Sequence, residues 1–251
     1  MPRFFVKNEQ IKEKTIEIIG EDIKHIKNVL RKQIGDDIEI CDRDTKKSYI
    51  CKIEKIEDKI ILTKIVKELQ SNDNMIEVDI YQGLPKADKM ELIIQKSIEL
   101  GANAIIPVKM KRCVVKIDSK DEIKKITRWQ KIAESAAKQS GRNEIPQIKN
   151  IVDIEKIIQL IDQYDKVIVA YENEKENTIK HELLNLKEKI RVNNKIKIAI
   201  VIGPEGGLEE KDVETLKQYG AVSVTLGNRI LRTETVALNI LSIIMYELEI
   251  E

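Results

Sequence analysis

From about residue 75 onward, short apolar runs alternate with longer stretches whose apolar residues recur at helical spacing. The run Ile198-Ala199-Ile200-Val201-Ile202 is apolar at every position, which is typical of a strand covered on both faces. Alternation of such strands with helices predicts an α/β fold with a parallel, doubly wound sheet. Strands are expected over residues 77–81, 104–108, 166–170, 197–202 and 221–226. Helices are expected over residues 89–100, 122–139, 154–161, 177–190, 209–219 and 233–247.

The first 70 residues or so have a different pattern, with many short β-branched runs separated by charged turns. One helix is expected over residues 21–30, with Ile23, Ile26, Val29 and Leu30 near one face. So many short strands predict a small β-barrel. The polar residues 71–74 end this pattern, so we expect two domains, 1–72 and 73–251. Strands are expected over residues 4–6, 15–19, 37–41, 48–56 and 59–66.

The composition limits the partners and cofactors of the chain. Of its 251 residues 42% are hydrophobic, which suffices for a packed core, and 35% are charged. Because the net charge is only +1, any nucleic-acid site must come from local clusters of basic residues. Cys41, Cys51 and Cys113 are scattered, and His25 and His181 lie far apart, so we expect reduced thiols and no metal. The sequence shows neither an apolar signal core nor a long apolar span, so we expect a cytoplasmic protein without a membrane partner.

Three of the expected strands are followed by chemically distinctive segments. The first is Ala170-Tyr171-Glu172, and the second is Gly203-Pro204-Glu205-Gly206-Gly207, which directly precedes a helix. The third covers residues 226–232 and precedes Thr233, a candidate N-cap. Ligands of open parallel sheets bind beyond the carboxyl ends of the strands. We therefore expect the three segments to form one pocket.

The glycine-rich second segment restricts the ligand. It is neither the dinucleotide fingerprint nor a Walker A loop, which ends in Lys-Ser/Thr. Glu205 stands where a polyphosphate would need donors and cations, so ATP and NAD are disfavoured. S-adenosylmethionine has ribose hydroxyls and a positive sulfonium, and both tolerate a carboxylate. The structural alternative is a tight strand-to-helix turn followed by an ordinary capped helix.

The last expected helix carries no charged residue between Thr235 and Tyr246. A helix that is apolar on most sides is buried on most sides. Thr235, Asn239, Ser242 and Tyr246 nevertheless fall on one stripe at helical spacing. Core packing alone could explain the helix, but a subunit interface explains the uncharged polar stripe better. We therefore predict a homodimer.

At these segments the chain resembles a known family. Residues 203–207 together with residues 226–235, which end in Leu231-Arg232-Thr233-Glu234-Thr235, are similar to the SPOUT methyltransferases. More narrowly they resemble the bacterial 16S ribosomal RNA uridine-N3 methyltransferases. Residues 25–36 resemble the PUA-like domain of that family. Further matching stretches are residues 89–91, 94–101, 112–113, 129–133 and 139–143, so the resemblance spans nearly the whole chain. One departure is Lys138, where members often carry Glu, which leaves open any structural pairing of this side chain.

The resemblance implies a small N-terminal PUA-like β-barrel that binds RNA and a C-terminal SPOUT domain. The SPOUT domain would contain a parallel sheet with a deep trefoil knot, a rare exception to un-knotted topology. It also implies a homodimer through the knotted domain. The implied cofactor is S-adenosylmethionine, with S-adenosylhomocysteine as product, and the implied substrate is the decoding-centre uridine in helix 44 of 16S rRNA within the 30S subunit.

The same resemblance assigns the site residues. Methylation at N3 requires loss of a weakly acidic imide proton, and a guanidinium would stabilise the resulting anion. Arg232 is the first candidate for that role. Glu205 or Glu234 would accept the proton or hold polar groups of the cofactor, although either could be a plain charge in the first turn of a helix. The expected cofactor-binding residues are Ala170, Tyr171, Glu172, Gly203, Glu205, Gly207, Leu226, Gly227, Ile230 and Leu231.

RNA contacts are expected from clustered cations, because phosphate binding needs them. In a lysine-rich chain any single lysine is more often a solvated surface residue, whereas arginines suit bidentate phosphate contacts. Trp129 could stack on a base, although burial as a helix anchor is its commoner role. The expected RNA-binding residues are Arg3, Arg31, Lys86, Arg112, Lys116 and Arg142.

Three other functions remain open at the level of sequence. A SPOUT methyltransferase could act on tRNA or 23S rRNA instead. A non-catalytic RNA-binding module would be expected to have a degraded pocket, yet all three segments are intact. A nucleotide-hydrolysing α/β enzyme is disfavoured because no Walker lysine or metal-binding carboxylate pair follows the glycines.

Overall fold

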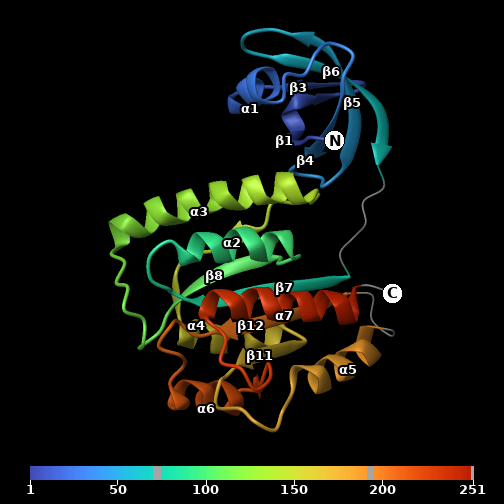
Figure 1. Cartoon of the computed structure of the whole chain (residues 1–251). Coiled ribbons are helices and arrows are strands. Elements are labelled where there is room, and N and C mark those ends of the chain that lie inside the picture. The colour runs from blue at the N-terminus through green and yellow to red at the C-terminus, as the bar shows by residue number, and fades with distance from the viewer. Residues whose placement is uncertain (70–74, 191–194, 250–251) are drawn as a thin grey trace. The chain divides into compact units, whose positions relative to one another are not determined.

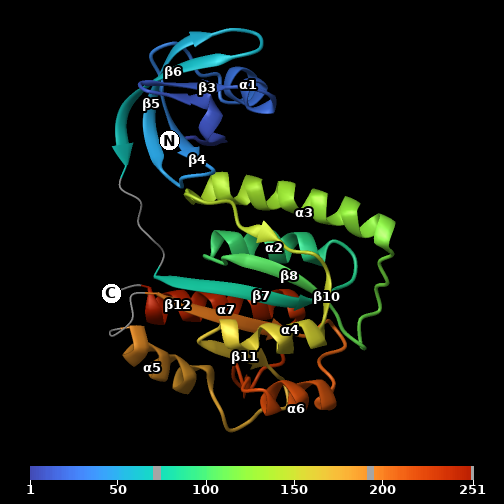
Figure 2. The same ribbon diagram turned by 180° about the vertical axis from the view of Figure 1, so that it is seen from behind.

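The computed structural model of the chain describes residues 1–69, 75–190 and 195–249 (Figures 1 and 2). By their contacts the residues form two compact units. Unit 1 combines Met1–Asp73 with Ala137–Ile145, and unit 2 combines Asn74–Ala136 with Pro146–Glu251. The expected break at residues 71–74 lies outside the described residues.

Unit 1 is built on a curled six-stranded sheet with the order β1-β4-β5-β6-β3-β2. β1 pairs with β4 in parallel and the other pairings are antiparallel. Two register shifts between β5 and β6 bend these long strands, as bulges do. One face of the sheet buries a core that includes Phe4, Ile16, Ile38 and Ile53. The strands are β1 (Arg3–Val6), β2 (Ile11–Lys12), β3 (Thr15–Ile18), β4 (Asp37–Asp42), β5 (Ser48–Ile56) and β6 (Ile61–Leu69), and a short 3-10 turn, η1 (Asn8–Gln10), precedes β2.

The helix expected over residues 21–30 is shorter and changes type. α1 (Glu21–Lys24) continues into a π-helix, η2 (His25–Val29). Ile23 and Ile26 are buried as expected, but Val29 is 66% exposed. A π turn is wider than an α turn, so it carries Val29 away from the face that Ile23 and Ile26 share. Val29, which was expected near the same helical face as Ile23 and Ile26, is therefore exposed instead.

The second segment of unit 1 is held by side-chain contacts. Asn143 Oδ1 accepts hydrogen bonds from Arg3 Nη1 at 2.9 Å and from Ser48 Oγ at 3.2 Å. Lys138 Nζ pairs with Asp22 Oδ1 at 2.8 Å. The lysine that departs from the family pattern therefore has a structural partner of opposite charge.

Unit 2 contains a parallel sheet with the order β10-β8-β7-β12-β11-β13, and β9 adds to β8. The expected strands all form, as β7 (Ile76–Gly83), β8 (Ala104–Lys109), β11 (Lys166–Ala170), β12 (Ile196–Ile202) and β13 (Val222–Val224). Two-residue strands β9 (Gln147–Ile148) and β10 (Val152–Asp153) were not expected, because so short a run has no visible period. β13 ends earlier than expected, because Thr225 turns the chain by bonding Gly227.

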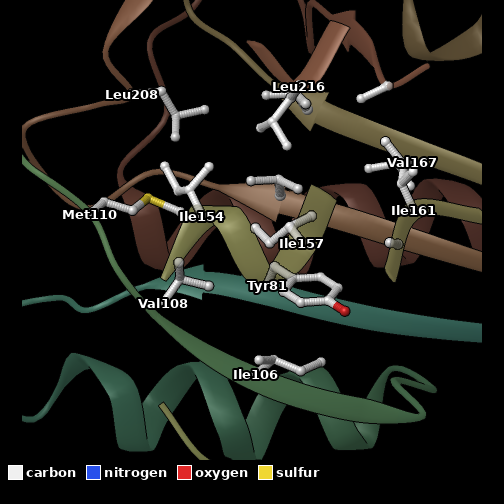
Figure 3. Packing of buried hydrophobic residues seen from close by; sticks show 14 of the residues in the cluster. Tyr81, Ile106, Val108, Met110, Ile154, Ile157, Ile161, Val167, Leu208 and Leu216 are labelled. Carbon is white, nitrogen blue, oxygen red and sulfur yellow. The ribbon is translucent and has the colours of Figure 1, made fainter. Parts of the chain in front are cut away.

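Helices cover both faces of this sheet, as the apolar strands require. α2 (Lys89–Glu99) and α7 (Thr233–Leu248) pack together over one face (Figure 1). α4 (Ile154–Leu160) and α6 (Glu210–Gln218) cover the other face, where Ile157 and Leu216 meet Tyr81, Val167 and Val201 (Figure 3). The remaining helical elements are α3 (Ser119–Ser140), η3 (Ile161–Gln163) and α5 (Ile179–Ile190).

Candidate active site

Three neighbouring strands end side by side at one edge of the sheet in unit 2. In the register of the sheet, Ala170 at the end of β11 pairs with Ile202 of β12 and with Val224 of β13. The segments that follow these strands therefore start at the same level. Parallel strands direct their carboxyl ends to a common edge, so the expected convergence of the three segments is confirmed.

The three segments enclose one cavity of about 800 Å³. It is lined by residues 170–172, 174–175, 202–207 and 224–233, together with Lys89 and Val236 from the adjoining helices. All ten residues expected to bind a cofactor lie in this lining. Arg232 and Glu205 also line it, whereas Glu234 does not. The geometry therefore brings together two of the three expected catalytic residues directly.

Gly207 lets the first two segments approach closely. Its φ is +71°, and a Cβ at this position would overlap Glu172 Oε1. Its N–H donates to the Pro204 carbonyl at 2.9 Å, which closes the turn. Only glycine combines this backbone conformation with the contact to Glu172. The glycine-rich segment is thus more than a strand-to-helix turn, because it forms a wall of the cavity.

Glu205 is held by donors on the loop after β7. The N–H of Lys86 donates to its two carboxylate oxygens at 3.0 and 3.3 Å, and Lys89 Nζ lies 3.1 Å from Oε1. Burial alone would raise the pKa of Glu205, but these backbone and lysine contacts outweigh it and keep the pKa below its usual value. Lys89 Nζ also lies 3.2 Å from Glu234 Oε2. Glu205 is therefore an ionised carboxylate, and Glu234 reaches the site only through Lys89.

Arg232 is exposed at the start of α7 and faces the cavity. Its carbonyl accepts the N–H groups of Thr235 and Val236, at 2.8 and 3.0 Å, which fixes its backbone as the cap of the helix. In the described part of the chain, its guanidinium has no recorded ion pair or side-chain hydrogen bond. An arginine that is anchored by its backbone but has free donors can serve a ligand.

The expected N-cap role of Thr233 was wrong. Thr233 is the first residue of α7, and its hydroxyl donates to the Gly203 carbonyl at 2.7 Å. The same oxygen accepts a bond from Gln82 Nε2 at 2.8 Å. Because Thr233 already lies inside the helix, its hydroxyl does not cap α7 but joins α7 to the residue that follows β12.

Several residues of the site were missed at the level of sequence. Lys89 and Gln82 act through partners more than a hundred residues away, so no local pattern identifies them. Glu174 lines the cavity and holds its own loop. Residues 76–84 also contain Glu77 and Asp79, so the polar character of Gln82 did not single it out.

The expected RNA-binding cations have different environments. Arg3 is committed to Glu39, Gly141 and Asn143 within unit 1, and only 11% of its side chain is exposed, which disfavours a phosphate contact. Arg31 is exposed at a positive φ of 51°. Arg142 is half-buried and already engaged. The remaining three, Lys86, Arg112 and Lys116, are exposed on loops of unit 2.

The remaining expectations concern Trp129, the cysteines, metal binding and membrane-spanning helices. Trp129 is 4% exposed, so it anchors α3 rather than offering a ring to a base. Cys41, Cys51 and Cys113 are free thiols, and burial raises the pKa of Cys51 to about 12. Across the described residues, no group of three or more His, Cys, Asp or Glu side chains could hold a metal ion. None of the described helices is both long and apolar enough to cross a membrane.

Comparison with known proteins now identifies the family. Residues 72–245 match the model of the RNA methyltransferase domain, and residues 18–66 match that of the RNA methyltransferase PUA domain. The chain belongs to this RNA methyltransferase family. It is 41% identical to ribosomal RNA small subunit methyltransferase E of Bacillus subtilis, over all of this chain and 98% of that protein.

Solved structures of other family members have the same fold. Ribosomal RNA small subunit methyltransferase E of Neisseria gonorrhoeae, solved with S-adenosyl methionine bound, is 29% identical with a TM-score of 0.81 over 98% of this chain and 97% of that one. A putative methyltransferase of Legionella pneumophila, also solved with this cofactor, is 29% identical with a TM-score of 0.80 over 97% and 96%. The expected combination of a PUA domain with an α/β RNA methyltransferase domain is therefore confirmed.

Proposed function

We propose that the chain transfers a methyl group from S-adenosylmethionine to N3 of the decoding-centre uridine in helix 44 of 16S rRNA, in the small ribosomal subunit. The observation that carries this proposal is the single cavity at three aligned strand ends, lined by every residue expected to bind the cofactor. Relatives that share nearly the whole length of the chain are named for small-subunit ribosomal RNA, and the one from Neisseria gonorrhoeae was solved with the cofactor.

The cavity suits S-adenosylmethionine. Its volume of about 800 Å³ falls within the range of roughly 300 to 1,000 Å³ that is typical of small-molecule sites. Glu172 and Glu205 place carboxylates in the lining, which suit ribose hydroxyls and a sulfonium. When bound, the cofactor supplies a methyl group made electrophilic by its sulfonium centre. Residues 170–172, 203–207 and 226–231 would hold it.

Arg232 would stabilise the anion of the target base. Replacement of the N3 hydrogen by a methyl group requires N3 to lose its proton to solvent water, which leaves negative charge on the uracil ring. Arg232 lines the cavity and its guanidinium has no side-chain partner among the described residues, so it can bond the uracil oxygens as that charge develops. Its cation would thereby lower the pKa of the imide.

The acidic residues have a different role in this proposal. The lowered pKa of Glu205 makes it a weak proton acceptor, so we assign it to polar groups of the cofactor. Glu234 lies outside the cavity lining and pairs with Lys89, so we assign it to positioning that lysine. Lys89 in turn balances the charge of the two carboxylates.

We further propose a homodimer in the cytoplasm, formed through the domain that the resemblance expects to be knotted. α7 buries one side, including Ile240 and Ile244, while Ser242 and Tyr246 are exposed on the other. Tyr246 is 71% exposed and the cavity residue Ile230 is 88% exposed, which is unusual for such apolar side chains. Light scattering should give twice the mass of the 28.9 kDa chain, and Tyr246→Glu should shift it toward the monomer.

The function is tested by methyl transfer from labelled S-adenosylmethionine to small ribosomal subunits that lack the modification, with the modified base mapped. Wild type should label N3 of the helix 44 uridine. Arg232→Ala should lower kcat by about 100-fold, in the range seen when a group that stabilises transition-state charge is removed. Arg229→Ala is the matched variant, since it removes the same charge from the same loop, and it should cost less than about 10-fold.

Other outcomes would favour the alternatives. Cofactor binding without transfer to small subunits, but with transfer to tRNA or to 23S rRNA, would replace the substrate. An RNA-binding module without catalysis would bind RNA and not the cofactor. Equal losses in Arg232→Ala and Arg229→Ala would remove the specific role of Arg232.

A further inference from the structure

Two more strand ends lie beside the cavity, and sequence analysis did not connect them with it. In the sheet β7 adjoins β12 and β8 adjoins β7, and all three strands are parallel. Gln82 near the end of β7 pairs with Ile202 of β12, and Gly83 pairs with Val108 near the end of β8. The loops at residues 84–88 and 110–118 therefore leave the sheet at the edge where the cavity lies.

The two loops are fastened to two consecutive residues of the glycine-rich segment, one loop to each residue. The N–H of Lys86 donates to the Glu205 carboxylate at 3.0 and 3.3 Å. Arg112 Nη1 donates to the Gly206 carbonyl at 3.1 Å. A Cβ on Gly206 would come within 3.0 Å of Arg112 Cβ, so the second loop lies directly against the glycine. Two consecutive residues of the cavity wall, Glu205 and Gly206, thus each hold a loop that carries a cation.

The side chains of these loops point their charge to solvent. Lys86 and Arg112 are exposed, and in the described part of the chain no carboxylate pairs with either of them. Neighbouring lysines contrast with them, since Lys89 pairs with Glu205 and Lys111 pairs with Glu209 at 3.0 Å.

Ala87 adopts a φ of +52°, which a residue with a Cβ adopts only where its surroundings impose it.

We propose that these two loops form a phosphate clamp at the mouth of the cavity, in which Lys86 and Arg112 bind the RNA phosphates that flank the target nucleotide. The inference rests on the proposed function and adds the surface that receives the RNA strand. A base that enters the cavity must leave its stack, while its flanking phosphates stay outside. One N–H of the Arg112 guanidinium donates to Gly206. The remaining N–H groups of the planar guanidinium are then available for a bidentate phosphate contact. The clamp thereby sets the strand against the same segment that forms the cavity wall.

The test is equilibrium binding of unmodified small ribosomal subunits, in the presence of S-adenosylhomocysteine, across a series of KCl concentrations. The variants are Lys86→Ala, Arg112→Ala and the double variant. Lys156→Ala, an exposed lysine on α4, is the matched control. The double variant should bind about 10- to 100-fold more weakly, and the slope of log affinity against log salt should fall by about 1.5, since each lost phosphate contact contributes roughly 0.7 to 0.9. Calorimetry should show an unchanged Kd for S-adenosylmethionine.

Three results would contradict the clamp or the proposed function, and each points to a different explanation. An unchanged salt slope in the double variant, with or without a loss of affinity, would overturn the phosphate contact, because an acidic protein surface or a packing defect would then explain any loss. A parallel loss of cofactor affinity would also overturn it, since the two side chains would then act through the glycine-rich segment. Failure of methyl transfer by the wild type, with binding and salt slopes as expected, would remove the proposed function and leave the clamp.

Discussion

At the scale of single residues, the shape of the cavity depends on the absence of a Cβ atom at Gly207. Gly207 has a positive φ and lies against the Glu172 carboxylate, so Gly207→Ala combines backbone strain with a clash. We expect S-adenosylmethionine to bind at least about 10-fold more weakly to this variant, because Glu172 or the turn must move. Isothermal titration calorimetry measures this directly.

Gly220 supplies the control for that substitution. Its φ is +104°, and no atom lies within 4 Å of the position of a Cβ. Gly220→Ala therefore imposes strain of about 1 kcal/mol without a new contact. Gly207→Ala should lose at least as much stability as Gly220→Ala, and only Gly207→Ala should lose cofactor affinity. Equal cofactor affinities would show that the contact between Gly207 and Glu172 does not shape the site.

At the scale of elements, local patterns predicted much and tertiary contacts decided the rest. The principal strands and helices of unit 2 were predicted because their apolar periods are strong and their ends carry distinctive residues. The change from α-helix to π-helix at residues 25–29 was not predicted, because a π turn depends on packing rather than on propensity. The bonds from Gln82 to Thr233 and from Lys86 to Glu205 span 151 and 119 residues. No local pattern encodes partners at that separation.

The loop after β11 shows how an element of the cavity is kept in place. The Ser223 hydroxyl of β13 donates to Glu174, and the N–H groups of Lys175, Glu176 and Asn177 donate to its Oε1 at 3.0, 3.1 and 3.3 Å. These contacts, the serine first, lower the pKa of Glu174 from 4.5 to about 2. A depressed pKa means that the ionised carboxylate stabilises the fold at neutral pH.

Glu174→Gln should therefore destabilise unit 2 in a pH-dependent way. The loss should be about 1 kcal/mol at pH 7, because the group is partly open to solvent and its charge is screened. The stabilisation is complete above the ordinary pKa of 4.5 and disappears as the pH falls toward 2. Urea unfolding of both proteins from pH 7 to pH 2.5 measures the difference. A difference that stays constant over that range would contradict the assigned role of the carboxylate.

At the scale of the whole molecule, sequence position and spatial unit do not coincide. α3 is one continuous helix, yet its last turn and the residues up to Ile145 cluster with the first 73 residues. A boundary placed at a polar break cannot reveal this, because nothing in a continuous helix marks the change of surroundings. The bonds of Asn143 to Arg3 and Ser48 join this segment to the rest of unit 1.

Within unit 2 the two ends of the sheet have different tasks. The carboxyl ends of the strands form the cavity, while a buried polar network lies at the amino ends. Asp79 accepts the Tyr164 hydroxyl at 2.9 Å and the Asn103 amide at 2.7 Å, and Lys197 Nζ lies 3.7 Å away. Burial raises the pKa of Tyr164, so its hydroxyl keeps the proton that it donates to Asp79. The hydroxyl of Tyr81, 2.9 Å away, must then donate to Tyr164.

Tyr164→Phe should separate stability from catalysis. It removes one donor from the buried Asp79 and the acceptor of the Tyr81 hydroxyl, which should cost about 1 to 3 kcal/mol. Trp129 is the only tryptophan in the chain and is buried in the part of α3 that belongs to unit 2, so its fluorescence in urea reports this loss. Tyr219→Phe is the matched control, since that ring is 58% exposed and should change stability by less than about 0.5 kcal/mol. The kcat for methyl transfer and the Kd for the cofactor should remain at wild-type values in both variants below the unfolding transition. A lower kcat in a fully folded Tyr164→Phe protein would mean that the amino ends of the strands influence the cavity, and the division of the sheet into a structural end and a chemical end would then fail.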